Sequence, residues 1–391
     1  MQNNQIIPVV LTTDKNFIPY TSVTLYSICC NADKNKNYEV IIFYDNEIDL
    51  NNKIKFDYIL NQFSNFKLRF INIKQYFEKY CLKSNIPHVS NATFYRYVIP
   101  DVLQEYEKIV YLDTDLVVNA DVSELYEVDL EDNYFAACCD NSLRQQISLA
   151  LSSVESYKPV DEYFKKLGFE NVMEDYFNAG VLVFNTKLMR EDNVSQKMLE
   201  NAQNNNYIHS GQDPMNVISK GKVKFLPLNW NTMTWEPVEG SIKLLSEKYY
   251  NEYMEAVKNP KIVHYAAYVK PWLYPDSFLS EYFFKYARMT PFYEKIIEAR
   301  FKFVLDLEKN EIYKELQNNN NNDNNNNDNN TLILYLTKFK QIKYRYFKYR
   351  ILSSLTFGKL KEKYKEKRIK NKELYTYLKK YVTLKVKEEI K

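Results

Sequence analysis

The chain has 391 residues, of which 45% are hydrophobic, so it can bury the core of one large domain or two ordinary ones. Its 6 glycines form neither a G-x-G-x-x-G nor a G-x-x-x-x-G-K-[ST] pattern, which excludes the glycine-rich phosphate loops. The 5 cysteines are odd in number and include no C-x-x-C pair, which favours reduced thiols in the cytosol over a disulfide framework or a zinc site. We expect neither a secretory signal nor a membrane span, because the first residues carry no basic side chain and no apolar run reaches 18 residues.

Charge and composition divide the chain into unequal parts. The formal net charge is +3, but residues 331–391 hold 19 Lys and Arg against 5 Asp and Glu, a net charge of +14 that leaves −11 for the rest. Residues 317–330 are eleven Asn, two Asp and one Gln, a composition that cannot bury a core. We therefore expect a folded domain over residues 1–310, a disordered linker over 311–330 and a basic amphipathic helical tail over 331–391.

Strand-like and helix-like segments alternate through the first 120 residues or so. The expected strands are Ile6–Leu11, Tyr38–Tyr44, Lys67–Ile73 and a run that begins at Lys108. The expected helices between them are Pro19–Asn31, Leu50–Phe63 and the short segment Asn91–Val98. This alternation predicts an α/β sheet whose ligands bind at the carboxyl ends of the strands.

The second half of the domain continues the mixed pattern. The expected strands are Asn133–Cys139, the run after Tyr176, Lys222–Pro227 and Lys261–His264. The expected helices are Ser142–Leu167, Lys187–Asn204, Ser277–Tyr286 and Pro291–Asn310. In addition, Asp213 is expected to be the N-cap of a helix that begins at Pro214.

The clearest chemical signal is Asp113-Thr114-Asp115 at the end of the buried run that starts at Lys108. Side chains alternate along a strand, so both carboxylates are expected on one face, where they repel each other unless a cation lies between them. Oxygen ligands of this kind suit Mg²⁺ or Mn²⁺, which also bind phosphate oxygens. His264 at a later strand end could complete the metal shell, and Lys270 could pair with a phosphate. A bare D-x-D is common, so two solvated acids at a strand end stay an alternative.

Together with four other blocks, this motif resembles the family 8 glycosyltransferases, which are retaining enzymes of the GT-A fold. The resemblance covers roughly residues 6–285 and keeps the family's order of blocks. The blocks are Leu11-Thr12-Thr13-Asp14-Lys15-Asn16-Phe17, Thr93-Phe94-Tyr95-Arg96, Tyr111-Leu112-Asp113-Thr114-Asp115, Tyr176-Phe177-Asn178-Ala179-Gly180-Val181, and His264-Tyr265 with Lys270-Pro271-Trp272. It implies an α/β fold with a Rossmann-like mixed sheet flanked by helices, and transfer of glucose or galactose from a UDP-sugar.

The resemblance also implies roles for the residues at matching positions. Asp113, Asp115 and His264 would bind Mn²⁺, or Mg²⁺ in its place, and Lys270 would hold the β-phosphate of UDP. The implied contacts with UDP-glucose or UDP-galactose are Thr12, Asp14 and Asn16 at the uridine end, Ala267 beside the phosphates, Arg96, Asp140, Asn178, Ala179 and Gln212 around the sugar, and Thr114 as a further contact.

The residue implied beneath the sugar ring is Gln212, an amide and a poor nucleophile. This favours front-face transfer, in which the acceptor hydroxyl attacks on the leaving-group side and UDP takes its proton. Asp213 is the nearest candidate for a covalent role. The chain departs from the family at Ala267, where a glycine usually lets backbone approach the phosphate, and at Gly211, where relatives often carry an acid.

The basic tail places Tyr, Phe and Leu at helical spacing between Lys and Arg, which suits the surface of an anionic membrane. Each basic residue there contributes about 1 kcal/mol at most. We expect a bacterial enzyme on the inner face of the cytoplasmic membrane, with a lipopolysaccharide or lipooligosaccharide core as its oligosaccharide or glycolipid acceptor. A tail that is only solvated is the alternative.

Two functions of other classes stay open from the sequence. A nucleic-acid-binding protein would use the tail to contact phosphates and would bind in a salt-sensitive way without Mn²⁺ or UDP. The complete set of metal-binding residue types argues against it, so no nucleic-acid partner is expected. A catalytically inactive protein could instead keep the fold for glycan binding alone.

Overall fold

The computed structural model describes residues 5–45, 48–78, 80, 82, 91–151, 158–234, 245–266, 269–304, 306, 365–366 and 372. The chain divides into two compact units, residues 1–293 and 294–391. In the second unit, residues 294–304 are helical, which covers part of the helix expected over Pro291–Asn310. The linker expected over 311–330 and nearly all of the tail expected over 331–391 lie outside the described residues.

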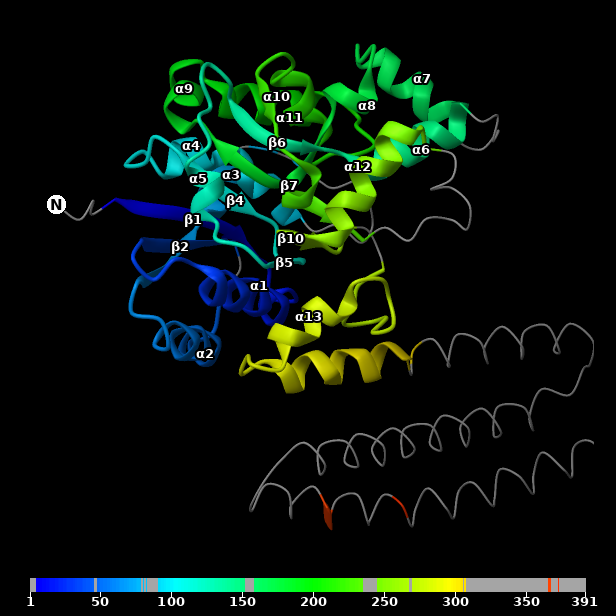
Figure 1. Cartoon of the computed structure of the whole chain (residues 1–391). Helices are drawn as coiled ribbons and strands as arrows, with labels where there is room; N and C mark the ends of the chain where they lie inside the picture. The colour runs from blue at the N-terminus through cyan, green and yellow to red at the C-terminus, as the bar shows by residue number, and fades with distance from the viewer. Residues whose placement is uncertain are drawn as a thin grey trace, which may run out of the picture. The chain divides into compact units, whose positions relative to one another are not determined.

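A seven-stranded mixed sheet forms the centre of the first unit (Figure 1). The strand order is β3–β2–β1–β4–β7–β6–β8, and β7 runs antiparallel to both of its neighbours. The strands are β1 (Ile6–Thr12), β2 (Asn37–Tyr44), β3 (Phe66–Asn72), β4 (Ile109–Leu112), β6 (Phe135–Cys139), β7 (Phe177–Phe184) and β8 (Val223–Phe225). β4, β6 and β7 are buried along their whole length, which explains their nearly continuous apolar sequences.

A second, three-stranded sheet carries the other half of the site. It consists of β5 (Leu116–Val118), β9 (Thr232–Met233) and β10 (Ile262–His264) in the order β5–β10–β9. β10 pairs antiparallel with β5, so that His264 lies opposite Leu116, and parallel with β9, so that it lies opposite Met233. This register brings the chain that follows β4 next to the end of β10.

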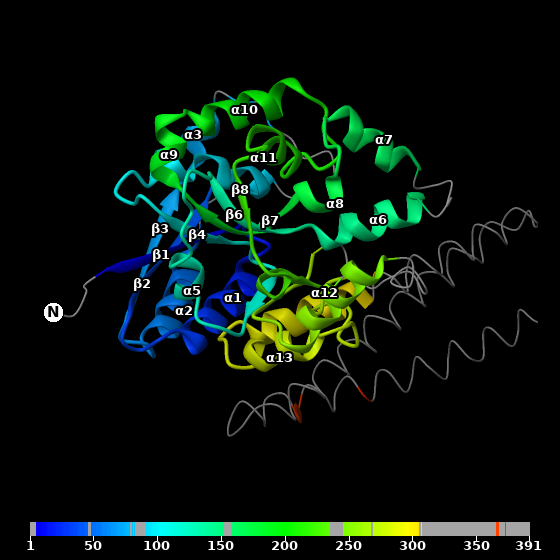
Figure 2. The same ribbon diagram turned by 45° about the horizontal axis from the view of Figure 1, so that its top comes forward.

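Helices cover both faces of the larger sheet. The views in Figures 1 and 2 place α1 (Ile18–Asn31), α2 (Leu50–Leu60) and α13 (Ser280–Ala287) on one face, and α9 (Thr186–Glu191), α10 (Val194–Asn204) and α11 (Asp213–Ile218) on the other. The remaining helices are α3 (Lys74–Phe77), α4 (Ile99–Val102), α5 (Ser123–Tyr126), α6 (Asn141–Leu151), α7 (Lys158–Lys166), α8 (Val172–Asp175) and α12 (Glu247–Lys258), with 3₁₀ helices η1 (Asn91–Val98) and η3 (Leu228–Asn231). The α/β architecture expected from the sequence is confirmed.

The core beneath α9 and α10 shows how the sheet and the helices share one apolar layer. Val10, Ile41 and Tyr111 from three adjacent strands pack in the same cluster as Met189 and Met198 from the helices, and all five are fully buried. Burying side chains of this size stabilises the fold by roughly 1.5–3 kcal/mol each. The core therefore holds β1 and β4 rigidly where their carboxyl ends reach the site.

Three local expectations were wrong. The helix expected over Lys187–Asn204 is two helices, because Asn193 between them adopts a left-handed conformation with φ of 53°. The helix that begins near Pro214 has Gln212, not Asp213, as its N-cap. The strand that starts after Lys108 ends at Leu112, so the D-x-D motif follows the strand instead of closing it. The helix expected over Ser142–Leu167 appears as α6 and α7, and residues 152–157 lie outside the described residues.

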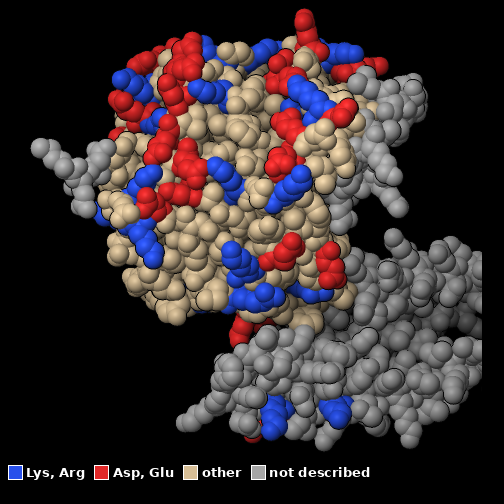
Figure 3. Space-filling model, viewed as in Figure 1, with Lys and Arg blue, Asp and Glu red and all other residues tan. Residues whose placement is uncertain are grey.

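Two features of the described residues concern contact with a membrane, namely the hydrophobicity of the helices and the distribution of surface charge. Within the described residues, no helix combines the length and hydrophobicity needed to cross a bilayer. On the face drawn in Figure 3, acidic and basic side chains of the described residues are interspersed.

Candidate active site

A cavity of about 490 Å³ lies where the carboxyl ends of β1 and β4 meet the start of β7. Most of the residues predicted for the site line it: Thr12, Asp14, Arg96, Asp113, Thr114, Asp115, Asp140, Asn178, Ala179, Gln212, His264 and Lys270. Asn16 and Asp213 are absent from this lining, and Ala267 lies outside the described residues. The strand-end location agrees with the general rule for ligand sites in α/β sheets.

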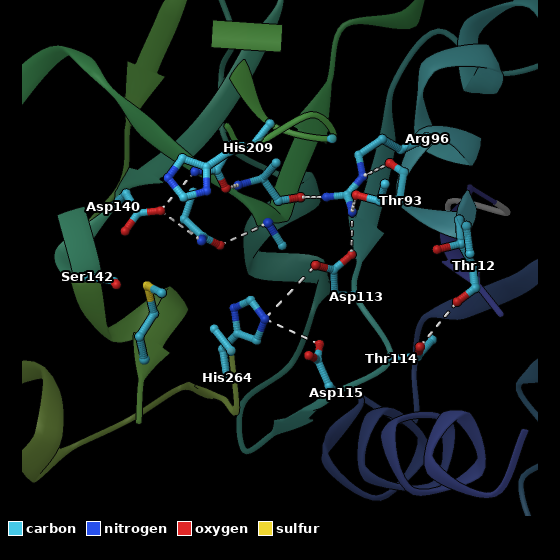
Figure 4. Close-up of a pocket in the computed structure, with 18 of the residues that line it drawn as sticks. Thr12, Thr93, Arg96, Asp113, Thr114, Asp115, Asp140, Ser142, His209 and His264 are labelled. Atoms are coloured by element: carbon cyan, nitrogen blue, oxygen red, sulfur yellow. Dashed lines mark hydrogen bonds and ion pairs between the residues drawn. The ribbon is translucent and has the colours of Figure 1, made fainter. Parts of the chain in front are cut away.

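Asp113, Asp115 and His264 form a cluster that could hold a metal ion (Figure 4). Each offers one ligand atom, and these atoms lie within 4.8 Å of one another. Nε2 of His264 is 3.3 Å from Oδ1 of Asp115 and 4.0 Å from Oδ2 of Asp113. Two carboxylate oxygens and one imidazole nitrogen suit Mn²⁺, and an oxygen-rich shell also suits Mg²⁺.

The two aspartates converge for a different reason from the one predicted. They lie in the turn between β4 and β5, which belong to different sheets, so strand alternation does not orient them. The amide of Asp113 donates to the carbonyl of Gly180 at 2.8 Å, and the amide of Tyr265 donates to the carbonyl of Asp115 at 2.9 Å. The first bond ties the turn to β7 and the second ties it to the end of β10, which brings both carboxylates to His264.

Lys270 supplies positive charge beside this cluster. Its Nζ lies 2.6 Å from Oδ2 of Asp115 and donates to the carbonyl of Tyr265, also at 2.6 Å. Burial alone raises the pKa of the Asp115 carboxyl, but the positive charge of Lys270 beside it outweighs burial and holds that pKa well below its usual range. Asp115 is therefore a carboxylate at neutral pH, the form that binds a cation.

Arg96 holds the other carboxylate. Its Nη2 lies 3.0 Å from Oδ1 of Asp113, its Nε donates to the carbonyl of Thr93 at 2.9 Å, and its Nη1 donates to the carbonyl of Ala179. Burial opposes the charged form, yet the Asp113 carboxylate raises the pKa of the Arg96 guanidinium above its ordinary value. Oδ1 of Asp113 also accepts the Tyr111 hydroxyl at 2.5 Å, which leaves Oδ2 turned toward His264.

The cavity end formed by β1 contains two of the three residues predicted for the uridine end, Thr12 and Asp14. Oδ1 of Asp14 accepts the backbone amides of Asn16 at 2.7 Å and of Phe17 at 3.1 Å, which orders the turn before α1. Thr114 donates its hydroxyl to the carbonyl of Thr12 at 3.2 Å. The side chain of Asn16 is exposed, so the structure places it outside the cavity.

The opposite side of the cavity is an array of amides around Asp140, on the other side of the cluster from Thr12 in Figure 4. Oδ1 of Asp140 accepts the amide of Leu143 at 2.9 Å and so caps α6. Its Oδ2 accepts Nδ2 of Asn178 at 3.1 Å and Nε2 of Gln212 at 2.9 Å. Gln212 in turn accepts the amide of Ala179 at 2.9 Å. All four residues are therefore fixed in place before a ligand binds.

Two residues that shape the metal cluster have roles that the sequence pattern did not indicate. Oδ1 of Asn231 lies 2.9 Å from Nδ1 of His264, a contact that no local motif indicates. Gly180 lies so close to His264 that an added Cβ would be 2.3 Å from Cε1 of the ring. Gly180 belongs to one of the blocks quoted from the sequence, but the sequence did not indicate why a glycine is needed there. Close packing also explains the glycine at position 211, because a Cβ added there would lie 1.9 Å from the Thr93 hydroxyl.

Asp213 is part of the protein's structural framework. Its carboxylate is fully buried and accepts the hydroxyls of Tyr163, at 2.6 Å, and Tyr176, as well as the amide of His209 at 2.8 Å. These three donors occupy the carboxylate, and Asp213 is absent from the residues that line the cavity. Its buried hydrogen bonds hold α11 against the chain that precedes β7.

Replacing Asp213 with alanine is expected to lower the free energy of unfolding by about 2–4 kcal/mol, because it leaves two tyrosine hydroxyls and one amide unpaired. Urea unfolding followed by circular dichroism measures this. Asp161→Ala is the control, since among the described residues Asp161 pairs with the exposed Lys165 alone, and it should change stability by less than about 0.5 kcal/mol. Unchanged stability with lost catalysis in Asp213→Ala would contradict the structural role.

Comparisons with known sequences agree with this geometry. The pattern of Glycosyl transferase family 8 matches residues 8–276. A putative glycosyltransferase of Haemophilus influenzae is 29% identical over 231 residues, covering 58% of this chain and 64% of the relative. General stress protein A of Bacillus subtilis is 23% identical over 280 residues, covering 70% of this chain and 89% of the relative. The match thus spans slightly less than two thirds of the Haemophilus protein.

Solved structures show the same architecture. The bifunctional glycosyltransferase WbbM in its apo form superposes with a TM-score of 0.66 at 29% identity, over 76% of this chain and 52% of WbbM. The galactosyltransferase LgtC, solved with donor and acceptor sugar analogues, gives a TM-score of 0.56 at 23% identity, over 73% of this chain and 96% of LgtC. The LgtC likeness supports the fold, and the WbbM match covers about half of that longer protein.

Proposed function

This chain belongs to glycosyl transferase family 8 and has the GT-A fold, and from that premise we propose that it transfers glucose or galactose from a UDP-sugar to a saccharide acceptor with retention of configuration. The observation that carries the proposal is the convergence of Asp113, Asp115 and His264 on one point of a cavity that Lys270 also lines. A cation-binding cluster beside a lysine is the arrangement that a diphosphate leaving group needs.

The chain's own residues would bind and neutralise the diphosphate in separate ways. Asp113, Asp115 and His264 would hold Mn²⁺, which when bound acts as a Lewis acid on the diphosphate oxygens. Lys270, which lines the cavity and bonds Asp115, would donate to the β-phosphate as negative charge develops on UDP. Arg96 holds the Asp113 carboxylate in place, so that it is positioned to bind the ion.

The sugar end supports front-face transfer. Gln212 lines the cavity with an amide whose oxygen and nitrogen already bond Ala179 and Asp140. Asp213 is buried behind it with its carboxylate fully engaged. Because neither residue offers a free carboxylate beneath the sugar, we propose that the acceptor hydroxyl attacks on the face that UDP leaves. Asp140 and Asn178 would bind sugar hydroxyls in this arrangement.

The acceptor and the location are the remaining parts of the proposal. We propose a lipopolysaccharide or lipooligosaccharide core as acceptor, reached from the inner face of the cytoplasmic membrane. The support is the charge of residues 331–391, which carry 19 Lys and Arg against 5 Asp and Glu and suit an anionic lipid surface. In this proposal residues 1–310 catalyse transfer, 311–330 act as a linker and 331–391 bind the membrane reversibly.

UDP release from a panel of UDP-sugars, with and without Mn²⁺, tests the donor half of the proposal, because slow donor hydrolysis needs no acceptor. We expect Mn²⁺-dependent release from one UDP-hexose by the wild type and none above background by Asp113→Ala, which lacks a ligand for the ion. Thermal unfolding of both proteins confirms that the variant is folded.

The outcome also separates the competing functions. If the wild type releases UDP from no donor and calorimetry detects no donor binding with Mn²⁺, the proposed activity is wrong. Donor binding without turnover would favour an inactive glycan-binding protein on the same fold. Salt-sensitive binding of RNA or DNA that ignores Mn²⁺ would favour the nucleic-acid alternative.

A further inference from the structure

The geometry points to Asn231 as a positioning residue that keeps a proton on Nδ1 of His264, leaves Nε2 free for the metal ion, and links that histidine to the residues around the donor sugar. The inference rests on the proposed use of His264 as a metal ligand. Asn231 ends η3 and lies 33 residues before His264 in the sequence, yet the two side chains meet in the interior.

A continuous chain of side-chain hydrogen bonds connects the metal cluster with the sugar end of the cavity. Nδ1 of His264 is 2.9 Å from Oδ1 of Asn231, and Nδ2 of Asn231 donates to Oδ1 of Asn178 at 2.9 Å. Nδ2 of Asn178 donates to Oδ2 of Asp140 at 3.1 Å, which also accepts Nε2 of Gln212 at 2.9 Å.

The direction of these bonds follows from groups whose role is fixed. The amide of Gly180 can only donate, and it lies 3.0 Å from Oδ1 of Asn178, so this side of the Asn178 amide must be the oxygen. Asn231 therefore has to turn its NH₂ group toward Asn178, because two facing oxygens would repel each other. This leaves Oδ1 of Asn231 facing the imidazole of His264.

An oxygen that faces Nδ1 requires a proton on Nδ1. A neutral imidazole carries only one N–H, so Nε2 of His264 then keeps its lone pair, and Nε2 is the atom that faces Asp113 and Asp115. A second hydrogen bond that fixes the tautomer and ring orientation is how proteins commonly prepare a histidine for a metal. Here the backbone amide of Gly180 determines that tautomer through two asparagine side chains.

Burial favours this tautomer of His264 over the opposite one. Asn231 is 2% exposed and His264 is 3% exposed, so water cannot readily replace either partner. An unpaired buried Nδ1 or amide would lose its contact with water without gaining a partner, which is unfavourable. The opposite tautomer would break this bond and the Asn231–Asn178 bond together, because the Asn231 amide would have to rotate.

The link to Asn178 has a second consequence. Asn178 holds Asp140, and Asp140 holds Gln212, so the same asparagine that orients the metal ligand also supports the groups proposed to bind the sugar. We therefore expect the metal affinity and the donor KM to respond separately when the two ends of the Asn231 side chain are altered one at a time.

The tautomer can be measured directly in protein labelled with ¹⁵N-histidine, since the chain has only 3 histidines. The His88→Gln and His209→Gln variants assign the signals. In the wild type saturated with diamagnetic Mg²⁺, we expect His264 to show a protonated Nδ1 and an unprotonated Nε2. A proton on Nε2 in protein that binds Mn²⁺ would overturn the inference without touching the proposed activity.

Two variants then separate the ends of the side chain. Asn231→Ala removes both bonds and is expected to weaken Mn²⁺ binding, followed by electron paramagnetic resonance, about 10–100-fold. Asn231→Asp keeps an oxygen for Nδ1–H of His264 but cannot donate to Asn178, so Mn²⁺ affinity should stay within about threefold while the KM for the UDP-sugar rises about tenfold. Asn229→Ala is the matched control, because Asn229 is in the same short helix and its Oδ1 has no partner among the described residues.

Each result has a definite meaning. If Asn231→Ala binds Mn²⁺ as tightly as the wild type, or if Asn231→Asp and Asn231→Ala change Mn²⁺ affinity equally, the positioning role is wrong. If the wild type itself binds neither Mn²⁺ nor a UDP-sugar, the proposed function fails and this inference falls with it. Should Asn231→Ala fail to fold, the tautomer of the wild type still decides the question.

Discussion

Asp115→Asn is expected to lower the rate of UDP release by about 10³-fold or more, since it removes a proposed metal ligand and the partner of a lysine at once. The Asp115 carboxylate lies 3.3 Å from Nε2 of His264 and 2.6 Å from Nζ of Lys270. An amide at this position binds a divalent cation more weakly and leaves Lys270 without its counter-charge. A 10³-fold loss corresponds to about 4 kcal/mol of transition-state stabilisation.

Steady-state kinetics with the preferred UDP-sugar and calorimetric titration of Mn²⁺ check this expectation. The control is Asp132→Asn, which also removes a carboxylate paired with a lysine, at 3.2 Å from Lys222, but on the surface. Its activity should match the wild type, because Asp132 is absent from the cavity lining and an exposed pair of this kind contributes little to stability. If Asp115→Asn keeps both the Mn²⁺ affinity and the activity of the wild type, Asp115 does not bind the metal ion.

The fold could be predicted from the sequence wherever local pattern and tertiary environment agree. β1, β4 and β7 are buried on both faces, so their apolar runs identified them and their order indicated an α/β sheet. Element ends were harder to predict because single residues decide them. Asn193 interrupts a helical pattern through its backbone conformation alone, and the strand before Asp113 ends where the chain passes to a second sheet.

The clustering of the candidate site residues could be predicted where they keep a recognisable spacing, as Asp113 and Asp115 do. The contacts that hold these residues could not be predicted. Asn231 reaches His264 only because η3 leads directly into β9, which pairs with β10, and no short motif encodes that pairing. Asp213 illustrates the converse, since its position next to Gln212 suggested chemistry, whereas its carboxylate is occupied by buried hydrogen bonds.

Gly180→Ala is expected to reduce Mn²⁺ affinity at least about tenfold and UDP release about 10²-fold, although the change adds a single methyl group. The new Cβ would lie 2.3 Å from Cε1 and 2.9 Å from Nδ1 of His264, and 3.0 Å from Oδ2 of Asp113. The ring must therefore move away from the cluster. Gly180 is fixed on both sides, because its amide donates to Asn178 and its carbonyl accepts the Asp113 amide at 2.8 Å, so β7 cannot shift instead.

A double-mutant cycle shows whether the methyl group acts through the histidine ring. Removing the ring by His264→Ala makes room for the added Cβ, so Gly180→Ala should cost little further Mn²⁺ affinity in that background, and the two effects should be strongly non-additive. Fully additive losses would mean that Gly180→Ala weakens Mn²⁺ binding by disturbing β7 and not by displacing the His264 ring. The result also tests the site as a whole, because Gly180 lies close to both Asp113, in the turn after β4, and His264, at the end of β10 in the other sheet. Only a close approach of the two sheets brings these two side chains together.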